Sequence, residues 1–337
     1  MEKNIHVPVN PTYHEIKNNF TMEWKKKKDN KYWVYRNKWE HNPKHFILED
    51  APLHLDIEPT NACNLKCPMC PRTVLLNKPS ESDFKVGHMQ LDTYKKIIDE
   101  AVEIGVYSVK LNWLGEPLVH PDIVEMVSYA KRKGIIDVMF NTNGVLLTKE
   151  ISNGLIEAGL DKLFFSFDSP DKEKYEQIRV GADYDATLNN IKKFIELRNL
   201  HGDISTLTRV SMVLMESNET EYNNFVNLFK DITDIVAYVE YRKPIGQDKQ
   251  GEYFPRRFAC SQLWQRMFIS WDGDVIVCCV DSEKEYIVGN IHKESIRDIW
   301  INDKYTRIRE SHKSGNCFKA DICKKCDLPY KNTDGSI

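Results

Sequence analysis

From residue 53 to residue 241 the sequence alternates between short runs typical of β-strands and longer stretches with helical periodicity. The predicted strands are 54–58, 108–114, 138–141, 162–168, 209–215 and 235–241. Amphipathic stretches such as 187–200 lie between them. Strands that alternate with helices in this order form a parallel sheet with right-handed crossovers. Because six strands are too few for the closed eight-stranded barrel, the sequence predicts an α/β fold with an open, partial (β/α)6 barrel.

Three cysteines follow the first predicted strand: Cys63, Cys67 and Cys70, with the spacing C-x3-C-x2-C. One short loop thus supplies three thiolates, whereas a cubane iron–sulfur cluster usually has four. A three-thiolate site leaves one iron open to an exchangeable ligand, as a catalytic zinc site keeps one position free. A partial zinc site is the alternative on this spacing alone.

Polar and glycine residues follow the next three predicted strands. Gly115 and Glu116 come after the second strand, Asn143 after the third, and Ser166 and Asp168 at the end of the fourth. The carboxyl ends of barrel strands are where active sites lie, so we expect these residues at one rim with the cysteines. Asn143, Ser166 and Asp168 are equally well explained as turn or capping residues.

The cysteine spacing resembles the signature of the radical S-adenosylmethionine (SAM) enzymes. The resemblance implies that Cys63, Cys67 and Cys70 hold a [4Fe–4S] cluster whose open iron chelates the amino and carboxylate groups of SAM. One-electron reduction then cleaves SAM into methionine and a deoxyadenosyl radical. Gly115-Glu116-Pro117 is similar to the family element beside the SAM amino group, where glycine lets the backbone approach closely.

The same resemblance gives four further candidate SAM contacts. Ser166 and Asp168 are similar to positions that contact the SAM ribose or carboxylate, and Asn143 lies at the same rim. Arg179 is a candidate partner of the SAM carboxylate, with an ordinary surface arginine as the alternative.

A second group of cysteines begins beyond residue 255: Cys260, Cys278, Cys279, Cys317, Cys323 and Cys326. Its spacing resembles the start of the SPASM pattern, a C-terminal module with auxiliary iron–sulfur clusters. The full pattern has seven cysteines for two clusters, so these six resemble the shortened twitch form, with one auxiliary [4Fe–4S] cluster. The resemblance implies four ligands: Cys260, Cys278, Cys323 and Cys326. Cys279 or Cys317 could replace a neighbour, and a zinc ribbon is the alternative site.

The chain divides into an N-terminal extension (1–50), the barrel (51–250), a small hairpin-plus-helix module (251–330) and a tail (331–337). Asp-Gly at 272–273 separates β runs at 268–270 and 275–277, which predicts a hairpin. Helices are predicted at 291–300 and 305–311. The extension mixes basic and aromatic residues, and we expect its aromatics to pack on the barrel rather than form a nucleic-acid strip.

Charge and hydropathy narrow the partners. A formal net charge of −3 gives no attraction to nucleic acid or anionic membranes. The longest apolar runs contain acidic residues and are too short to span a bilayer. The chain opens without an apolar segment typical of a secretory signal, so we expect a cytoplasmic protein. A small-molecule substrate and an electron donor such as flavodoxin or ferredoxin are the expected partners.

The expected reaction is hydrogen abstraction from a carbon of a small hydroxylated substrate: a sugar, a sugar nucleotide or an aminocyclitol. Residues 52–61 and the single auxiliary cluster resemble members that oxidise, dehydrate or epimerise such molecules. Arg242, after the sixth strand, is a candidate for binding a substrate phosphate or carboxylate. The alternatives are a peptide maturase acting on a ribosomally made precursor, and a non-catalytic binding protein carrying zinc or a cluster. About 50 residues before the barrel are too few for the complete peptide-recognition domain common in such maturases.

Overall fold

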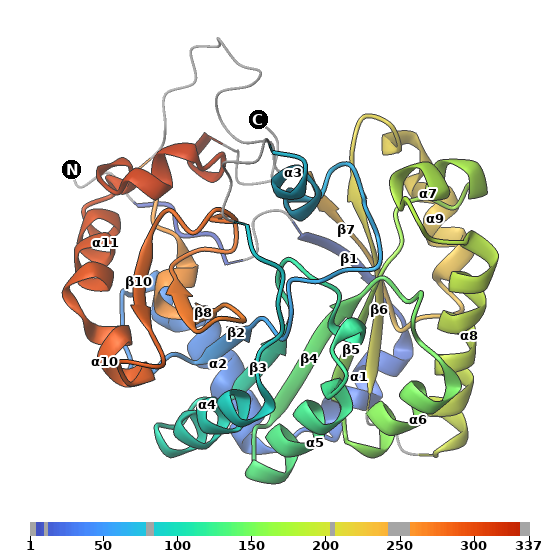
Figure 1. The fold of residues 1–337 in the computed structure, drawn as a ribbon, viewed down its shortest axis with the longest axis horizontal. Helices are drawn as coiled ribbons and strands as arrows, with labels where there is room; N and C mark the ends of the chain where they lie inside the picture. The colour runs from blue at the N-terminus through green and yellow to red at the C-terminus, as the bar shows by residue number, and fades with distance from the viewer. Residues whose placement is uncertain (1–4, 10–12, 79–83, 203–205, 242–256, 331–337) are drawn as a thin grey trace.

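The computed structural model describes residues 5–9, 13–78, 84–202, 206–241 and 257–330 (Figure 1). Its central strands are β2 (His54–Ile57), β3 (Ser108–Leu111), β4 (Asp137–Thr142), β5 (Lys162–Ser166), β6 (Leu207–Leu214) and β7 (Ile235–Glu240). These six strands are parallel and lie side by side in chain order. The predicted partial barrel is therefore confirmed, with strand ends shifted by a few residues at most.

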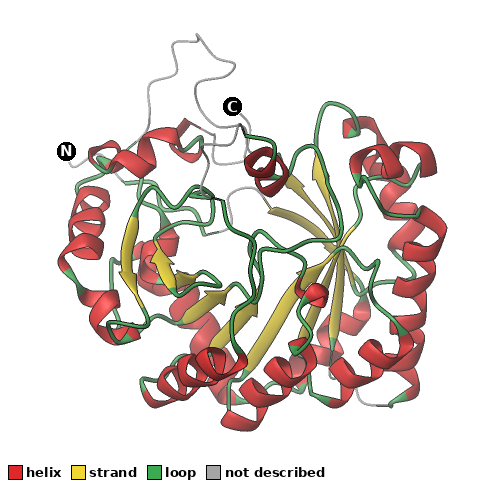
Figure 2. Ribbon diagram, viewed as in Figure 1, coloured by secondary structure: helices red, strands yellow, loops and turns green. Residues whose placement is uncertain are grey.

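Helices cover the convex side of this sheet (Figure 2). They are α4 (Leu91–Glu103), α5 (Ile123–Lys133), α6 (Lys149–Glu157), α7 (Lys172–Ile178), α8 (Tyr184–Leu200) and α9 (Tyr222–Phe229), whereas α3 (Pro71–Leu76) lies beyond the rim (Figure 1). Val109, Val138 and Val210 are fully buried on the strand face that the helices cover. Because successive strand residues point to opposite faces, the alternate residues line the concave side.

The sheet continues beyond the six strands at both ends. β8 (Arg266–Ile269) pairs in parallel with β2, and β9 (Asp274–Ile276) and β10 (Ile287–Asn290) follow in antiparallel order. At the other end, β1 (Tyr13–Lys17) pairs antiparallel with β7. The predicted C-terminal hairpin is present, and it extends the barrel sheet into one of ten described strands. Strands β1 and β10 were not predicted.

The C-terminal helices are α10 (Ile296–Ile301) and α11 (Asp303–Lys313). The helix predicted at 291–300 was wrong in its first half, where the chain turns. α10 begins only after Ser295, whose hydroxyl accepts the N–H of Asp298. Short 3-10 turns complete the module: η3 (Ser261–Trp264), η4 (Cys317–Lys319), η5 (Asp321–Lys325) and η6 (Leu328–Tyr330).

The N-terminal helices α1 (Asn19–Lys26) and α2 (Asn30–Lys44) close the amino-terminal end of the barrel. A buried aromatic group (Trp24, Tyr32, Tyr35, Trp39) packs on Leu53, Leu207 and Ile235, at the starts of β2, β6 and β7. The expected packing of aromatics on the barrel is thus confirmed. No helix in the described ranges is long and apolar enough to cross a membrane.

Candidate functional site

The three clustered cysteines lie on the loop between β2 and α3, at the carboxyl end of the first barrel strand. Neighbouring segments hold this loop through backbone groups. Thr60 donates its hydroxyl hydrogen to the Gly87 carbonyl (2.7 Å), and the Asn61 side chain donates to Lys85 (2.7 Å) and accepts from Gly87 (2.8 Å). The N–H of Lys66 donates to the Val180 carbonyl (3.0 Å). These bonds tie the cysteine loop to the segments around residues 85–87 and 180.

Gly115 is required by a close approach to the same loop. The Glu116 N–H donates to the Ala62 carbonyl at 2.9 Å. A Cβ on Gly115 would stand 2.6 Å from the Ala62 oxygen and closer still to that of Thr60. Any side chain here would push the cysteine loop away from the end of β3.

Glu116 is buried and joins the ends of β3 and β4. Its Oε1 accepts hydrogen bonds from the Thr142 hydroxyl (2.8 Å) and the Leu118 N–H (3.1 Å), and its Oε2 accepts the Asn143 N–H (2.7 Å). Burial raises the pKa of this carboxyl, and the three donors oppose the rise. The family resemblance implies that the Glu116 carboxylate contacts the SAM amine. Within the protein, this carboxylate already accepts three hydrogen bonds.

Asn143 reaches the cysteine loop directly. Its Nδ2 donates to Asn64 Oδ1 at 2.8 Å and lies 4.0 Å from Cys63 Sγ. Its Oδ1 accepts the Val145 N–H, so the turn role expected of an Asn-Gly pair is also present. Ser166 ends β5 on the concave face, opposite Ser211 of β6.

Arg179 and Asp168 form a buried ion pair, with 2.5 Å between Arg179 Nε and Asp168 Oδ2. Asp168 also accepts the Val213 N–H at 2.7 Å, which anchors it to β6. Arg179 Nη1 lies 4.0 Å from Cys67 Sγ. The Arg179 side chain is thus 13% exposed and is held against Asp168 beside a cluster cysteine, rather than lying free on the surface.

The Cys63 and Cys67 thiols have raised pKa values, which bears on how a cluster would bind. Burial raises the pKa of Cys63 to about 11 and also raises that of Cys67, while the Arg179 charge opposes the rise at Cys67. Iron binds the thiolate, so cluster assembly must release these protons. Within the described ranges, no three His, Cys, Asp or Glu side chains surround a point where a single metal ion would fit. Three cysteines on one anchored loop, with cations nearby, fit a cluster with one open iron.

Comparison with known families shows to which class of proteins the chain belongs. The radical SAM superfamily model matches residues 57–227, which includes the three cysteines and the rim residues. This chain belongs to the radical SAM superfamily. A second model, the SPASM iron–sulfur cluster-binding domain, matches residues 260–327. The chain is thus a radical SAM enzyme with a C-terminal SPASM domain, and these families imply SAM and iron–sulfur clusters as cofactors.

Curated relatives of this radical SAM enzyme carry different names. The tungsten-containing aldehyde ferredoxin oxidoreductase cofactor-modifying protein of Pyrococcus furiosus is 26% identical over 334 residues, covering 83% of this chain and 90% of that protein. The GTP 3',8-cyclase of Alkaliphilus oremlandii is 31% identical over 202 residues, covering 58% of each chain. The match to that cyclase therefore leaves out much of both proteins.

Solved structures share the fold. SuiB of Streptococcus suis superposes with a TM-score of 0.62 at 18% identity, covering 90% of this chain and 77% of SuiB. BtrN in complex with AdoMet and 2-DOIA gives a TM-score of 0.52 at 21% identity, covering 81% of this chain and 92% of BtrN. Identities this low establish the shared architecture and leave the substrate open.

The SPASM cysteines gather around α11. His312, on that helix, accepts the Cys260 N–H at Nδ1 (3.0 Å), and its Nε2 lies 3.3 Å from Cys323 Sγ. Burial lowers the pKa of His312 to about 4, so the ring is neutral and its Nε2–H points at the Cys323 sulfur. Burial raises the pKa of the Cys323 and Cys317 thiols, and the nearby charge of Cys326 adds to the rise at both.

Two cysteines left unassigned by spacing therefore have distinct positions. Cys317 is buried with Cys323 and Cys326 in one small cluster of side chains. Cys279 is adjacent to Cys278 in the chain. The hydrogen bond between their thiols and burial raise the pKa of Cys278, and the charge of Cys260 adds to the rise. The Cys279 carbonyl accepts the indole N–H of Trp113 at 2.9 Å, which brings this part of the module to the end of β3.

Sequence reasoning missed Glu58, which ties the two halves of the site together. Its Oε1 accepts the Leu114 N–H (3.1 Å) and its Oε2 accepts the Trp271 N–H (3.2 Å). Burial raises the pKa of Glu58 to about 7 against these two donors. An acidic residue ending an apolar strand, directly before the cysteine loop, was the available signal. Arg242 lies outside the described residues.

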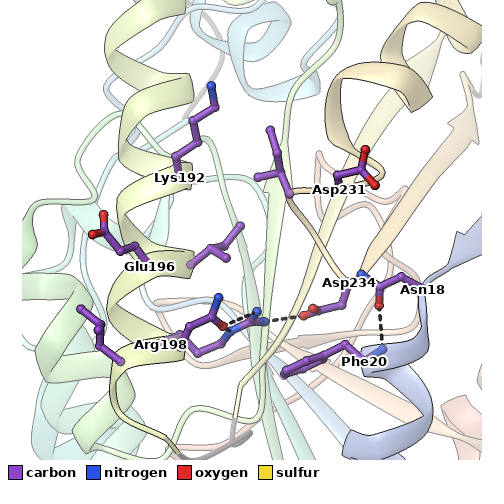
Figure 3. Close-up of a pocket in the computed structure, with 11 residues that line it drawn as sticks. Asn18, Phe20, Lys192, Glu196, Arg198, Asp231 and Asp234 are labelled. Carbon is purple, nitrogen blue, oxygen red and sulfur yellow. Dashed lines mark hydrogen bonds and ion pairs between the residues drawn. The ribbon is translucent and has the colours of Figure 1, made fainter.

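A pocket of about 600 Å³ lies elsewhere, at the amino-terminal end of the barrel (Figure 3). It is lined by α1, α8 and the start of β7, and it contains the buried Arg198–Asp234 pair, 2.5 Å apart. Phe20 stacks on the Arg198 guanidinium, 4.3 Å from ring centroid to carbon. None of the predicted site residues lines it, so we interpret this pocket as a junction between the extension and the barrel.

Proposed function

We propose that Cys63, Cys67 and Cys70 bind a [4Fe–4S] cluster with one open iron, and that SAM binds over it at the strand rim. When bound, this cluster and SAM supply a deoxyadenosyl radical that can take hydrogen from an unactivated carbon. The observation that carries the proposal is the anchored three-cysteine loop with the Arg179–Asp168 pair beside Cys67. Glu116 and Asn143 hold the loop and the end of β4 in one arrangement around it.

Gly115, Ser166 and Asp168 complete the proposed SAM surface, each with a different role. Gly115 leaves the rim open where its backbone meets the cysteine loop. Asp168 holds Arg179, whose remaining guanidinium hydrogens are available for the SAM carboxylate. Ser166 offers a hydroxyl at the carboxyl end of β5.

A second [4Fe–4S] cluster is proposed in the SPASM domain, on Cys260, Cys278, Cys323 and Cys326. Four thiolates would close this cluster and suit it to accept an electron, with flavodoxin or ferredoxin as the external donor for the first cluster. The neighbourhood of Cys317 and Cys326 supports Cys317 as the alternative fourth ligand. A zinc site in this module is the competing hypothesis.

The proposed substrate is a small hydroxylated molecule that is oxidised, dehydrated or epimerised. The name of the GTP 3',8-cyclase relative indicates a small-molecule substrate for that protein, which supports a small molecule rather than a polymer here. A peptide substrate is the alternative.

Metal content and SAM cleavage test the proposal together. Anaerobic reconstitution should give about eight irons per chain, and replacing Cys63, Cys67 and Cys70 by Ala should leave about half. Reduced wild-type protein should release deoxyadenosine, and the triple variant should release none. Cys278→Ala should lose the auxiliary cluster, whereas Cys279→Ala should keep it; the reverse result would make Cys279 the ligand in place of Cys278. Stoichiometric zinc in the SPASM domain would refute the two-cluster proposal.

Substrate class is tested by isotope transfer. Deuterated sugars, sugar phosphates and peptides are incubated with the reconstituted enzyme, and deuterium is followed into deoxyadenosine. Transfer from a peptide and from none of the sugars would overturn the small-molecule assignment.

A further inference from the structure

The concave face of the barrel keeps a solvent-accessible row of polar side chains beneath the rim. In β6, Val210 and Met212 are fully buried under the helices, whereas Arg209, Ser211 and Val213 are partly exposed. β4 shows the same alternation, with Met139 and Asn141 partly exposed. Side chains of the concave face are therefore reachable, although the face under the helices is not.

Lys110 is the first unusual member of this row. It stands in β3 between apolar residues, and the register sets it opposite Asp56 of β2. No hydrogen bond or ion pair of Lys110 lies within the described part of the chain. Burial lowers the pKa of this lysine to about 8; the charges of Arg209 and Arg266 act in the same direction, and the charge of Asp56 opposes the fall.

Arg209 lies on the same concave face as Lys110, on β6, three strands away in the sheet. Its guanidinium lies over the Phe164 ring, 3.7 Å from the centroid, and 5.0 Å from the centroid of Tyr13. The aromatic rings fix the plane of the guanidinium and cover its faces. Its Nε is buried without a hydrogen-bond partner, and the same is true of Asn141 Oδ1 and Ser211 Oγ.

The carboxylates on this face are already committed. Asp56 lies 3.3 Å from Arg266 Nη1 and 3.5 Å from His54 Nε2. Glu15 of β1 is paired with Lys17 and accepts the Tyr13 hydroxyl hydrogen. Two cations, Lys110 and Arg209, are thus left in excess among the described residues at this level. Holding two like charges near each other in a partly buried site is costly unless an anion binds between them.

We propose that Lys110 and Arg209 bind a phosphate group of the substrate inside the barrel. Asn141 and Ser211 are then the hydrogen-bonding partners for the hydroxyl groups of the substrate. A guanidinium with fixed orientation and a flexible ammonium are a common pair for phosphate oxygens. Arg209 stands two residues below Ser211, which is level with Ser166 at the rim, or about 7 Å at 3.3 Å per residue. A sugar ring attached to that phosphate would extend toward the cysteine loop.

This inference rests on the proposed function and narrows it from hydroxylated molecules to phosphorylated ones. Lys110 and Arg209 also replace Arg242 as the leading candidates for the anion site. A neutral aminocyclitol would leave both cations unpaired.

The test uses reconstituted, SAM-loaded enzyme and inorganic pyrophosphate as the probe, with affinity measured by anaerobic calorimetry. Lys110→Met and Arg209→Met should each weaken pyrophosphate binding at least about tenfold, since one hydrogen bond to a charged group is lost. Lys110→Arg keeps the charge and should keep most of the affinity. Lys96→Met, on the exposed face of α4, is the matched control and should bind like wild type.

Two results would overturn the inference: no pyrophosphate binding to wild type, or equal affinity in wild type, Lys110→Met and Arg209→Met. Thermal unfolding of each variant checks that it folds, and Lys110→Arg keeps the test valid if Lys110→Met does not. Deoxyadenosine release by wild type is measured in parallel without pyrophosphate. Release with no Lys110-dependent binding rejects the phosphate site alone, and binding without release rejects the proposed SAM chemistry alone.

Discussion

Replacing Glu116 tests whether its carboxylate stabilises the fold, contacts SAM, or does both. In Glu116→Ala, the Thr142 hydroxyl and the N–H groups of Leu118 and Asn143 all lose their acceptor. A hydrogen bond to a charged group contributes about 1.5–3 kcal/mol, but the desolvation cost of the buried carboxylate offsets part of the sum. We therefore expect a loss of about 3–5 kcal/mol in the free energy of unfolding.

Glu116→Gln gives a finer measure of the same joint. Its amide oxygen can still accept from Thr142 and Leu118, but its NH2 group would face the Asn143 N–H. One bond is lost and two donors oppose each other, for an expected loss of about 2 kcal/mol. Glu103→Ala, at the exposed end of α4, is the control and should change stability by less than about 0.5 kcal/mol.

The assays are thermal unfolding and anaerobic SAM titration of all three variants beside wild type. A loss of 3 kcal/mol corresponds to a fall in Tm of roughly 4 °C for a chain of this size, at about 2.1 cal/mol/K of unfolding entropy per residue. If Glu116 also binds the SAM amine, both substitutions at this site should weaken SAM binding about tenfold or more. A Glu116→Ala protein with wild-type Tm would refute the structural reasoning, and wild-type SAM affinity would remove Glu116 from the SAM site.

Three further predictions follow from single contacts. Gly115→Ala should reduce stability by about 1–3 kcal/mol and lower the iron content, because its Cβ would collide with the Thr60 carbonyl; melting and iron analysis test this. His312→Leu removes the donor at Cys323 and should lower the reduction potential of the auxiliary cluster, measured by redox titration followed by electron paramagnetic resonance. An unchanged potential would exclude the His312 hydrogen bond. Pyrophosphate affinity should fall as the pH rises through about 8, because the Lys110 ammonium is charged below its pKa and neutral above it; Lys110→Arg should lack this fall.

The barrel was predictable because its signals are local. Each parallel strand is a short segment with apolar residues at its helix-facing positions, which the hydrophobic pattern locates. Gly134 ends α5 with a positive φ of 100°, as its place after a helical stretch predicts. β1 was missed because Tyr13–Lys17 is largely polar and becomes a strand only by pairing with β7. β10 was missed because four residues carry too little pattern, and its pairing partner lies in the hairpin.

The cysteine groups were predictable from spacing, but their surroundings were not. The sequence left Arg179 either as a candidate SAM contact or as a surface arginine, and only the fold places it against Asp168 and Cys67. Lys110 and Arg209 are 99 residues apart in the chain and face each other through the curvature of the sheet. Such pairs depend on tertiary register, which a single sequence does not encode in any local pattern.

The link between barrel and SPASM domain bears on how two clusters can cooperate. β8 pairs with β2 over four residues, and the backbone N–H of Glu58 donates to Ile269 O at 2.9 Å. The Glu58 carboxylate then holds Leu114 and Trp271, so the ends of β2, β3 and β8 share one buried acceptor. Movement of the SPASM domain relative to the cysteine loop would have to break this backbone pairing and the two bonds to Glu58, so the structure favours a constant relative position. The conformational freedom needed to admit different substrates must therefore come from side chains and loops on the concave face.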